Sequence, residues 1–415
     1  MSLGLLFSLF TCAPLQVSPC PTDVWFDALP PSLESSILWR GDHEEGTLFD
    51  WDYGGGGNAG GGIFNTGGMQ VSASTVTSPV HSGSFAARAW ISNAWQVQNG
   101  SRAVRLMRWT DTAWNLGGDY FPDEAYYSAW FYFPHTYNPN KYAPWDPGDG
   151  GWWNIFQFKC NDAAGVSQPM FTVNVWHDDM TGEMSLYAYT KENTPSSYDQ
   201  IGPETVTLPV GRWVHLEAFY KASTTNAGEF VLWQDGVKII EALNVKTILP
   251  GDAEKPVWGV GNYTDHIDGG PTPGSATIFI DDAAVSTQRL GQVQSPWTHL
   301  GGGHSTVGAT PRFEASGTLE ADSLARFSIA SATPNTLTFF VFGTSALNLP
   351  LFGGQLVPST ELIVAAPVDP AGESLYCVAT PSTLSGAMLW AQGWVLEATG
   401  PLAFSSTNAV RGVAP

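Results

Sequence analysis

Polar side chains recur at alternate positions of short aromatic segments between Tyr126 and Tyr189. Four segments follow one another, YYSAWFYFP, WWNIFQFK, MFTVNVWHDD and MSLYAYT, and their nearly period-two pattern predicts β-strands. An alternating strand would place the polar members on one face beside exposed aromatic rings: Gln157, Lys159, Asn174, His177, Tyr187 and Tyr189. Sheets that bind sugars present such a face, so the pattern predicts a chain that handles a polysaccharide.

His177, at the end of VNVWHDD, is the best-placed imidazole for proton transfer. An imidazole has an ordinary pKa of about 6.5, which suits transfer near neutral pH. The alternative is a strand-end histidine bonded to Asp178 or Asp179. Tyr187 and Tyr189 share one face of their strand, where they either stack on sugar rings or complete a core layer.

Arginines recur every third residue in SRAVRLMRW, at Arg102, Arg105 and Arg108. On a strand, Arg102 and Arg108 share one face and Arg105 takes the other. One of these faces could line a cleft and bind a carboxylate bidentately, whereas ordinary surface arginine is the alternative. Trp153 and the loop residue His266 are further candidates for contacting a bound sugar.

The elements that would position these residues are strands rather than helices. The chain has 415 residues with 45 Gly, 29 Pro and 13% charged residues, a composition typical of turn-rich all-β proteins. The pair Asp235-Gly236 predicts a hairpin turn. About a dozen strands joined by short turns predict a two-sheet β-sandwich.

Changes in composition divide the chain into four regions. Residues 1–33 are predicted to hold a signal peptide and a polar, Pro-rich lead, and strand-like segments fill residues 34–290. A linker containing Gly and Pro is predicted at residues 291–310. Residues 311–415 contain Arg312, Arg326 and Arg411 but no Lys, and their short apolar segments predict a smaller β-sandwich.

The first residues predict export. The run LGLLFSLF before Thr11 resembles a secretion signal without its basic region, which predicts a secreted or cell-surface protein. A buried strand or a disordered tail is the alternative, and lipidation at Cys12 is a minor one. Cys12 and Cys20 could pair, whereas Cys160 and Cys377 are expected to be small buried residues. No other apolar run is long enough to span a bilayer.

The net charge limits the partners. A charge of -21 with only 17 basic residues argues against nucleic-acid binding, because neutralising phosphates requires clustered Lys and Arg. The same charge repels polyanions at long range. An acidic polysaccharide would therefore need a local basic patch within the cleft. We expect a monomer.

Several segments resemble the jelly-roll polysaccharide lyases, a concanavalin-like group that includes heparinase I, alginate lyases and glucuronan lyases. RGDHEEGTLFDW resembles their opening, YYSAWFYFP with WWNIFQFK a central strand pair, and ATIFIDDAAVS their closing strand. GRWVHLEAFY with GEFVLWQDGVKI resembles their back-sheet hairpin, so the resemblance covers about Leu38 to Ser286 and implies a jelly-roll sandwich. The tail from LTFFVFG onward resembles a small C-terminal β-domain of exported bacterial proteins.

The resemblance implies cleavage by β-elimination. Such lyases neutralise a uronate carboxylate with Gln, Asn or Arg, and they move the adjacent C5 proton with Tyr or His. Gln157 occupies the place of their strand Gln, while Lys159 stands where a His is common. Tyr263, in WGVGNYTDH, matches their strand Tyr and would need a cation such as Lys159 or Arg105 beside it to act as a base. No catalytic cofactor is implied.

The resemblance also implies a structural Ca²⁺. Asp42, Glu44 and Glu45 near the start, with Asp281 and Asp282 near the end, resemble the paired acidic segments that hold this ion in jelly-roll domains. Surface carboxylates without a metal are the alternative.

Two functions remain open on this sequence. One is an exported lyase acting on an acidic polysaccharide, and the other is a non-catalytic glycan-binding protein on the same sandwich. A laminarinase-type glycoside hydrolase is excluded because the E-x-D-x-x-E pattern is absent. The lyase interpretation predicts that Gln157, His177 and Tyr263 converge in one cleft.

Overall fold

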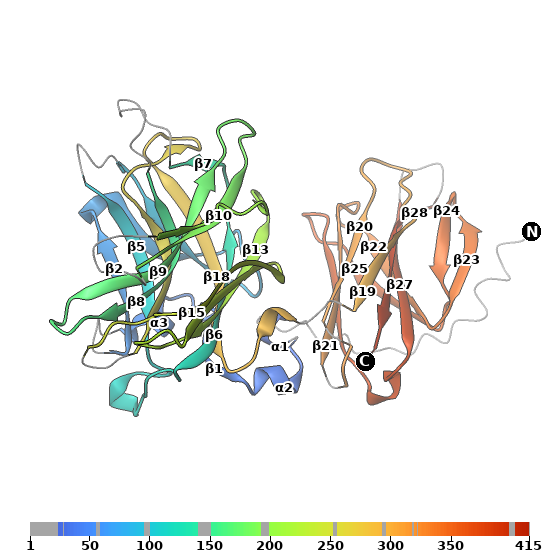
Figure 1. Ribbon diagram of the computed structural model, residues 1–415. Coiled ribbons are helices and arrows are strands. Elements are labelled where there is room, and N and C mark those ends of the chain that lie inside the picture. The colour runs from blue at the N-terminus through green and yellow to red at the C-terminus, as the bar shows by residue number, and fades with distance from the viewer. Residues whose placement is uncertain are drawn as a thin grey trace, which may run out of the picture. The chain divides into compact units, whose positions relative to one another are not determined.

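The computed structural model describes residues 24–27, 29–54, 59–94, 100–139, 151–191, 199–251, 255–292, 296–317, 319–321, 323–397 and 403–414. The chain folds into two compact units, a larger one of Ser35–Gln292 and a smaller one containing Val293–Pro415 (Figure 1). Two short helices, α1 (Val24–Asp27) and α2 (Pro31–Glu34), group with the smaller unit. The predicted secretion signal, Cys12 and Cys20 lie outside the described residues. Within the described ranges, no helix has the length and apolar character needed to cross a membrane.

The larger unit is built from two antiparallel sheets. The first sheet has the strand order β15 (Val237–Val245), β14 (Gly228–Gln234), β13 (Trp213–Lys221), β6 (Glu124–Tyr132), β18 (Ala276–Ser286), β4 (Ala86–Ile91) and β3 (Val71–Val76), with β1 (Ile37–Gly41) also paired to β18. The second sheet has the order β11 (Asp199–Ile201), β10 (Met184–Thr190), β9 (Ser167–His177), β8 (Trp153–Asn161), β16 (Val257–Thr264), β5 (Arg102–Arg108) and β2 (Gly61–Thr66), with β12 (Thr207–Leu208) paired to β10.

Short elements connect these strands. They are α3 (Phe49–Asp52), the 3₁₀ turns η4 (Gly68–Gln70), η5 (Trp114–Leu116) and η6 (Leu290–Gln292), and the pair β7 (Tyr137–Asn138) and β17 (Asp268–Gly269). In both sheets, neighbouring strands come from distant parts of the chain, as with β6 beside β18 and β8 beside β16. Such crossovers are typical of jelly rolls, and they confirm the predicted all-β sandwich.

One hydrophobic core lies between the two sheets. It is rich in aromatic rings because strand alternation turns every second residue of these aromatic segments inward. Phe158 of β8 stacks on Tyr220 of β13 with ring centres 3.8 Å apart, which joins the two sheets directly. The fully buried Trp258 of β16 lies 5.6 Å from the ring of Tyr127 on β6. The face of the second sheet turned away from this core is here called its outer face.

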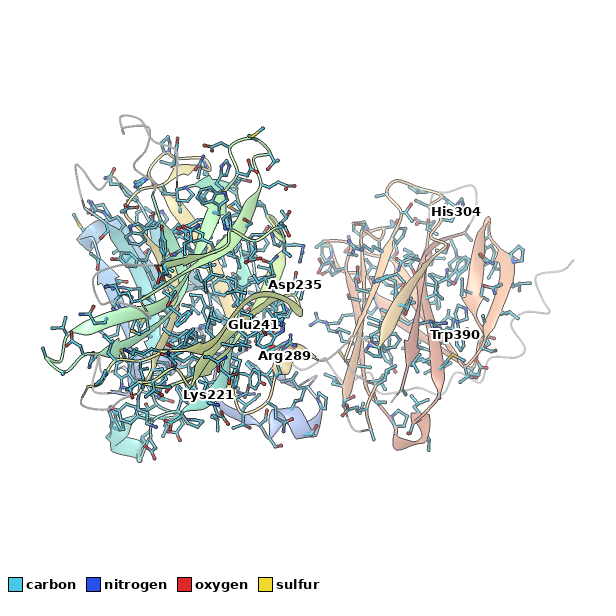
Figure 2. The ribbon with its side chains drawn as sticks, in the orientation of Figure 1. Lys221, Asp235, Glu241, Arg289, His304 and Trp390 are labelled. Atoms are coloured by element: carbon cyan, nitrogen blue, oxygen red, sulfur yellow. The ribbon has the colours of Figure 1, made fainter. Side chains whose placement is uncertain are left out.

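A buried ion pair anchors the end of the larger unit. Glu217 of β13 accepts hydrogen bonds from Arg289 Nε at 2.8 Å, from Leu290 N at 2.6 Å and from Gly291 N at 3.0 Å. The guanidinium of Arg289, marked in Figure 2, also lies 4.0 Å from the ring centre of Trp233. Three donors satisfy the buried carboxylate, so η6 is held against the first sheet at the point where the unit ends.

His215, beside this anchor, makes stability depend on pH. Burial, then His81 and Arg289, lower the pKa of His215 from 6.5 to about 3. A lowered folded-state pKa means stabilisation that is complete above about pH 6.5 and is lost as pH falls toward 3. We expect the free energy of unfolding to fall by up to about 1.4 kcal/mol per pH unit in that window, and His215→Gln to flatten the slope. Urea unfolding at several pH values measures this, and the exposed His135→Gln is the control. An unchanged slope in His215→Gln would contradict it.

Apart from α1, α2 and one 3₁₀ turn, the described part of the smaller unit is also built of strands. One sheet has the order β19 (Trp297–Gly301), β28 (Phe404–Val413), β27 (Met388–Leu396), β22 (Leu337–Gly343) and β25 (Leu362–Pro367). A second contains β20 (Arg312–Ser316), β21 (Leu324–Ala330) and β26 (Ser374–Ala379). The remaining elements are the paired strands β23 (Ala346–Leu351) and β24 (Gly354–Pro358) and the 3₁₀ turn η7 (Ser382–Leu384). Aromatic residues fill the core between the first two sheets, including Phe313, Phe327, Phe340 and Tyr376.

Two expectations differ from this structure. Part of the predicted linker at residues 291–310 forms β19, which pairs with β28 because Trp297 packs into the core of the smaller unit. Cys377 is disulfide-bonded rather than a free buried thiol, whereas Cys160 is free and buried as expected.

Candidate active site

Four polar side chains form one row across the outer face of the second sheet. The strand register pairs Tyr263 of β16 with Asn154 of β8, Asn154 with Asn174 of β9, and Asn174 with Tyr187 of β10. Neighbouring residues on these strands belong to the hydrophobic core, so the paired residues point outward. The row places two phenols and two amides, groups that bind sugar hydroxyls and carboxylates, on adjacent strands.

A second row lies beside the first. Gln157 of β8 pairs with Gly259 of β16 on one side and with Thr172 of β9 on the other, and Thr172 pairs with Tyr189 of β10. The Gln157 amide is buried, and its Nε2 lies 3.7 Å from the sulfur of Met107. Gln157 and Tyr263 therefore share one face, as predicted for a common site.

Glycines occupy two positions of β16 where it pairs with β5. A Cβ at Gly259 would lie 2.1 Å from Met107 Sδ, and one at Gly261 would lie 2.1 Å from the carbonyl oxygen of Val104. Real Cβ atoms do not approach that closely, so neither position accepts a side chain without movement. The missing side chain at Gly259 makes room for Met107, which lies over the glycine beside Gln157, and the missing side chain at Gly261 lets β16 lie close to β5.

Arg105 of β5 is the cation beside Tyr263. Its guanidinium carbon lies 5.0 Å from the ring centre of Tyr263, and it donates hydrogen bonds to Thr66 Oγ1 at 2.9 Å and to the Phe64 carbonyl at 3.4 Å. Burial lowers the pKa of Arg105, and Tyr263 opposes that shift. An arginine stays protonated at neutral pH, so a positive charge faces the phenol.

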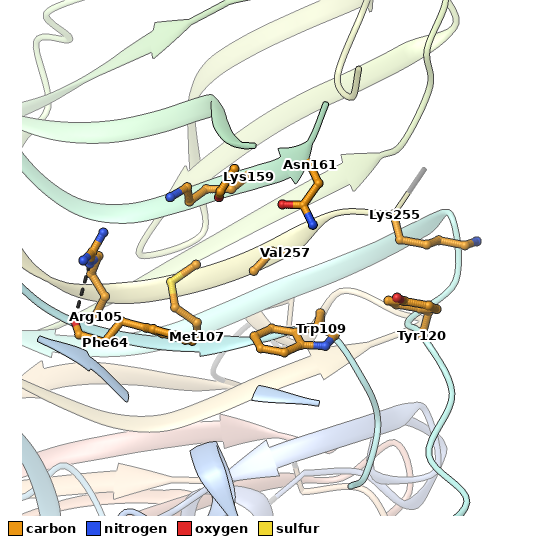
Figure 3. Close-up of a pocket in the computed structure, with 10 residues that line it drawn as sticks. Phe64, Arg105, Met107, Trp109, Tyr120, Lys159, Asn161, Lys255 and Val257 are labelled. Atoms are coloured by element: carbon orange, nitrogen blue, oxygen red, sulfur yellow. Dashed lines mark hydrogen bonds between the residues drawn. The ribbon is translucent and has the colours of Figure 1, made fainter. Parts of the chain in front are cut away.

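A pocket of about 420 Å³ opens next to Arg105 (Figure 3). Its lining includes Phe64, Met107, Trp109, Tyr120 and Val257, together with the cations Arg105, Lys159 and Lys255. Burial, and then the charge of Arg105, lower the pKa of Lys159. Three cations in one pocket of a chain with a net charge of -21 supply the local basic patch that binding of an acidic polysaccharide requires.

Tyr187 has different surroundings from Tyr263. It is 2% exposed, its ring stands nearly perpendicular to that of Tyr189 with centres 5.1 Å apart, and burial raises its pKa. A phenol held in its protonated form donates hydrogen bonds and is a poor base. We therefore assign Tyr187 to holding a ligand rather than to removing a proton.

His177 does not join this site. Asn174 and His177 are three residues apart on β9, so alternation turns His177 away from the outer face, on the side of Val173 and Val175. Its Nδ1 lies 3.0 Å from Asp179 Oδ1. The alternative of a strand-end histidine bonded to a neighbouring aspartate is what the structure shows, and the predicted convergence of His177 with Gln157 and Tyr263 is wrong.

Arg102 and Arg108 face the interior. Arg108 is fully buried and donates from Nε to the Thr110 carbonyl at 2.8 Å and from Nη1 to the Ala59 carbonyl at 3.2 Å. Arg102 is buried and donates to the carbonyls of Gly100 and Ser101, both at 3.2 Å. The predicted division of the three arginines between two faces is confirmed, and only the Arg105 face is available to a ligand.

Trp153 and His266 are buried as well. Trp153 lies in the core and donates from Nε1 to Asn262 Oδ1 at 2.8 Å, whereas its neighbour Trp152 contacts the Tyr263 ring with centres 4.5 Å apart. His266 is 2% exposed, and its Nδ1 lies 3.0 Å from Asp265 Oδ1. Trp152 thus takes the place predicted for Trp153 beside the site.

Two site residues, Asn154 and Trp152, were missed by sequence reasoning. Strict alternation from Gln157 would point Asn154 inward, but a register shift between Asn154 and Phe156 in the pairing with β9 turns Asn154 outward as well. Such a β-bulge changes the face without changing the residue types. The two consecutive tryptophans in WWNIF were the only available signal, and they do not show which one faces the site.

Four of the five carboxylates predicted to bind calcium are hydrogen-bonded or ion-paired to protein groups, and the fifth, Glu45, is exposed. Asp42 pairs with Arg40 at 3.3 Å, and Glu44 accepts backbone hydrogen bonds from Ser84 and Phe85. Asp281 and Asp282 are buried and bonded to the His81 and Ser82 segment, with Asp281 accepting from His81 N at 2.8 Å and Asp282 from Ser82 Oγ at 2.8 Å. Over the described ranges, no group of three or more His, Cys, Asp and Glu side chains could hold a metal. Calcium binding therefore stays a prediction, and no step below uses a metal.

A family model and several solved structures are similar to this chain. A family model described as polysaccharide lyase matches residues 43–284. The endo-β-1,4-glucuronan lyase of the fungus Trichoderma reesei is similar over 61% of this chain and 96% of its own, at 18% identity and a TM-score of 0.43. A marine alginate lyase of Aplysia kurodai is similar over 61% of this chain and 100% of its own, at 15% identity and a TM-score of 0.37.

A sugar-binding domain is also similar. The carbohydrate recognition domain of Emp46p is matched over 53% of this chain and 89% of its own, at 11% identity and a TM-score of 0.29. No curated protein matches the chain. Because the matching family model spans more than half of the 415 residues, the chain belongs to the polysaccharide lyase family.

Proposed function

We propose that this lyase cleaves a uronate-containing polysaccharide by β-elimination on the outer face of the second sheet. The observation that carries the proposal is the pairing of Arg105 with Tyr263, 5.0 Å from guanidinium to ring centre, on the same face as the amide of Gln157. A fixed cation, neutral hydrogen-bond donors and a phenol are the groups that this reaction needs.

Arg105 and Gln157 bind the uronate carboxylate in this proposal. The guanidinium neutralises the carboxylate, and the Gln157 amide donates a hydrogen bond to it. Withdrawing negative charge from the carboxylate makes the neighbouring C5 proton easier to remove, because the carbanion-like transition state places charge on the same oxygens. The partial burial of Arg105 strengthens this effect by excluding water.

Tyr263 moves the proton. In its deprotonated form it takes the C5 proton, and the electron pair of that C–H bond forms the C4–C5 double bond. The C4–O bond breaks at the same time, and the leaving glycosidic oxygen receives the proton that Tyr263 has taken. One proton passes from carbon to oxygen overall, so no water, oxidant or metal is consumed. His177 has no part in this scheme.

The charge distribution supports an anionic substrate. Arg105, Lys159 and Lys255 line one pocket, although the chain as a whole carries -21. Three cations attract a polyuronate, whose carboxylates can pair with them in place of solvent counterions. They do not attract a neutral polysaccharide. Lys159 pairs with Val257, so the stretch of β16 from Val257 to Tyr263 separates it from the phenol. We therefore place Lys159 as an electrostatic contact for the polymer and not as a group that moves the proton.

Export is part of the proposal. Cys377 is disulfide-bonded, and disulfides persist mainly in oxidising compartments outside the cytosol. A polymeric substrate too large to enter a cell also requires an enzyme that leaves it. We propose a secreted or cell-surface monomer.

Absorbance in the ultraviolet band of an unsaturated uronate tests the function. Purified protein is mixed in turn with polymannuronate, polyguluronate, polyglucuronate and pectate, and a neutral β-glucan is the control. We expect a steady rise on at least one polyuronate and none on the glucan, since only a uronate can form the conjugated double bond. No rise on any polymer, with binding retained in gel-shift experiments, would favour a non-catalytic glycan-binding protein.

A further inference from the structure

The pocket next to Arg105 extends beyond the residues that the reaction uses. Figure 3 shows Arg105 and Lys159 toward one end and Lys255 with Tyr120 at the other, with Val257, Trp109 and Asn161 between them. The distal part contains residues with no task in proton transfer, and here it is called the distal pocket: Trp109, Tyr120, Asn161, Lys255 and Val257. Lys255 lies at the far end of the pocket from Arg105. A ligand that fills the pocket can pair with both cations only if it carries a second negative group.

The walls of the distal pocket suit a sugar ring. Trp109 of the distal pocket and Phe64, which lies toward Arg105, have ring centres 6.5 Å apart at an interplanar angle of 34°, and together they give one aromatic side. Phe64 is 40% exposed, so its ring is available for contact. The carboxamide of the exposed Asn161 stands on the opposite strand β8 and supplies both a donor and an acceptor. An aromatic side facing polar groups is the usual construction of a sugar subsite.

A ligand carboxylate can replace Asp123 as the ion-pair partner of Lys255. Its ammonium pairs with Asp123, whose side chain is 67% exposed, while the Lys255 side chain is 29% exposed. An ion pair with so exposed a carboxylate contributes little stability, so a ligand carboxylate can displace Asp123 at little cost. The Lys255 stem lines the pocket next to Val257, which pairs with Lys159 across β16 and β8.

We propose that the distal pocket binds a second uronate, so that the preferred substrate carries carboxylates on successive sugars. This inference rests on the proposed function for the first uronate, which Arg105 and Gln157 hold. Lys255 binds the carboxylate of the sugar in the distal pocket, and Lys159 lies between the two ends. A homopolymer of uronic acid engages both ends, whereas a polymer in which uronates alternate with neutral sugars leaves Lys255 paired with Asp123.

Binding measurements on a non-cleaving variant test the distal pocket. Titration calorimetry with Tyr263→Phe compares hexasaccharides of mannuronate, guluronate and glucuronate with a hexasaccharide in which glucuronate alternates with a neutral sugar. Adding Lys255→Gln is expected to weaken binding of a homopolymeric hexasaccharide about fivefold and to leave the alternating one within about twofold. Lys238→Gln is the matched control, because Lys238 is exposed on the first sheet and pairs with Glu241. It should change neither affinity.

Each outcome decides a separate point. Equal weakening of both ligands by Lys255→Gln, or weakening of neither, would overturn the distal pocket as a uronate subsite. Stronger binding of a sulfated alternating hexasaccharide than of any homopolymer, with the same dependence on Lys255, would overturn the carboxylate assignment in favour of sulfate. If Lys255 dependence holds while the wild-type protein shows no ultraviolet rise, the subsite stands and the elimination reaction fails.

Discussion

Tyr263→Phe is expected to lower kcat by about a thousandfold on the polyuronate that the wild-type protein cleaves. The substitution removes only the phenol oxygen, which is the atom that takes and returns the proton, and general acid–base groups contribute factors of this size. The ring that contacts Trp152 and Arg105 is kept, so Tm and KM should change little. Initial rates from the ultraviolet band, with thermal unfolding of the same samples, measure both effects.

The matched control is Tyr126→Phe. Tyr126 also belongs to a cluster of aromatic rings, 5.0 Å from Phe219, but it lies on the first sheet away from the site. It should keep the wild-type rate. A Tyr263→Phe variant with more than about a tenth of the wild-type kcat would show that another group removes the proton.

Arg105→Met is expected to lower kcat/KM about a hundredfold. Methionine keeps much of the aliphatic length but removes the charge that neutralises the carboxylate, and losing one such preorganised donor typically has an effect of this order. The loss should appear in kcat more than in KM, because charge on the carboxylate grows in the transition state. Steady-state kinetics on the same polyuronate separates the two constants.

Arg88→Met is the control for this arginine. Arg88 likewise lies over an aromatic ring, 5.9 Å from the centre of Trp90, but on β4 of the first sheet. Its replacement should leave kcat/KM unchanged. If Arg105→Met and Arg88→Met had the same activity, the carboxylate would be held elsewhere and the proposed site would be wrong.

Strand alternation predicted much of this site correctly. The alternation of apolar and polar residues in FQFK and in MSLYAYT placed Gln157, Lys159, Tyr187 and Tyr189 on the outer face, where the structure has them. It also separated Arg105 from Arg102 and Arg108. Period-two patterns hold wherever one face of a strand packs on a core, and that condition is met along β5 and β10.

Contacts between distant segments determine the features of the site that strand alternation does not predict. Which arginine face is interior depends on carbonyl acceptors from distant segments, such as Ala59 for Arg108, and these come together only in the fold. The bulge in β8 turned Asn154 outward and Trp153 inward, and no residue type marks it. Lys255 lies outside any strand, so periodicity carries no information about its place in the pocket.

The mass of the products tests elimination most directly. The polyuronate is digested in water labelled with heavy oxygen, and the fragments are analysed by mass spectrometry. If the polymer is cleaved by β-elimination, the fragment masses sum to that of the intact chain, each new non-reducing end is unsaturated, and no heavy oxygen is incorporated. Fragments that together exceed the intact chain by one water for each cut and carry the heavy oxygen would show hydrolysis and contradict the mechanism.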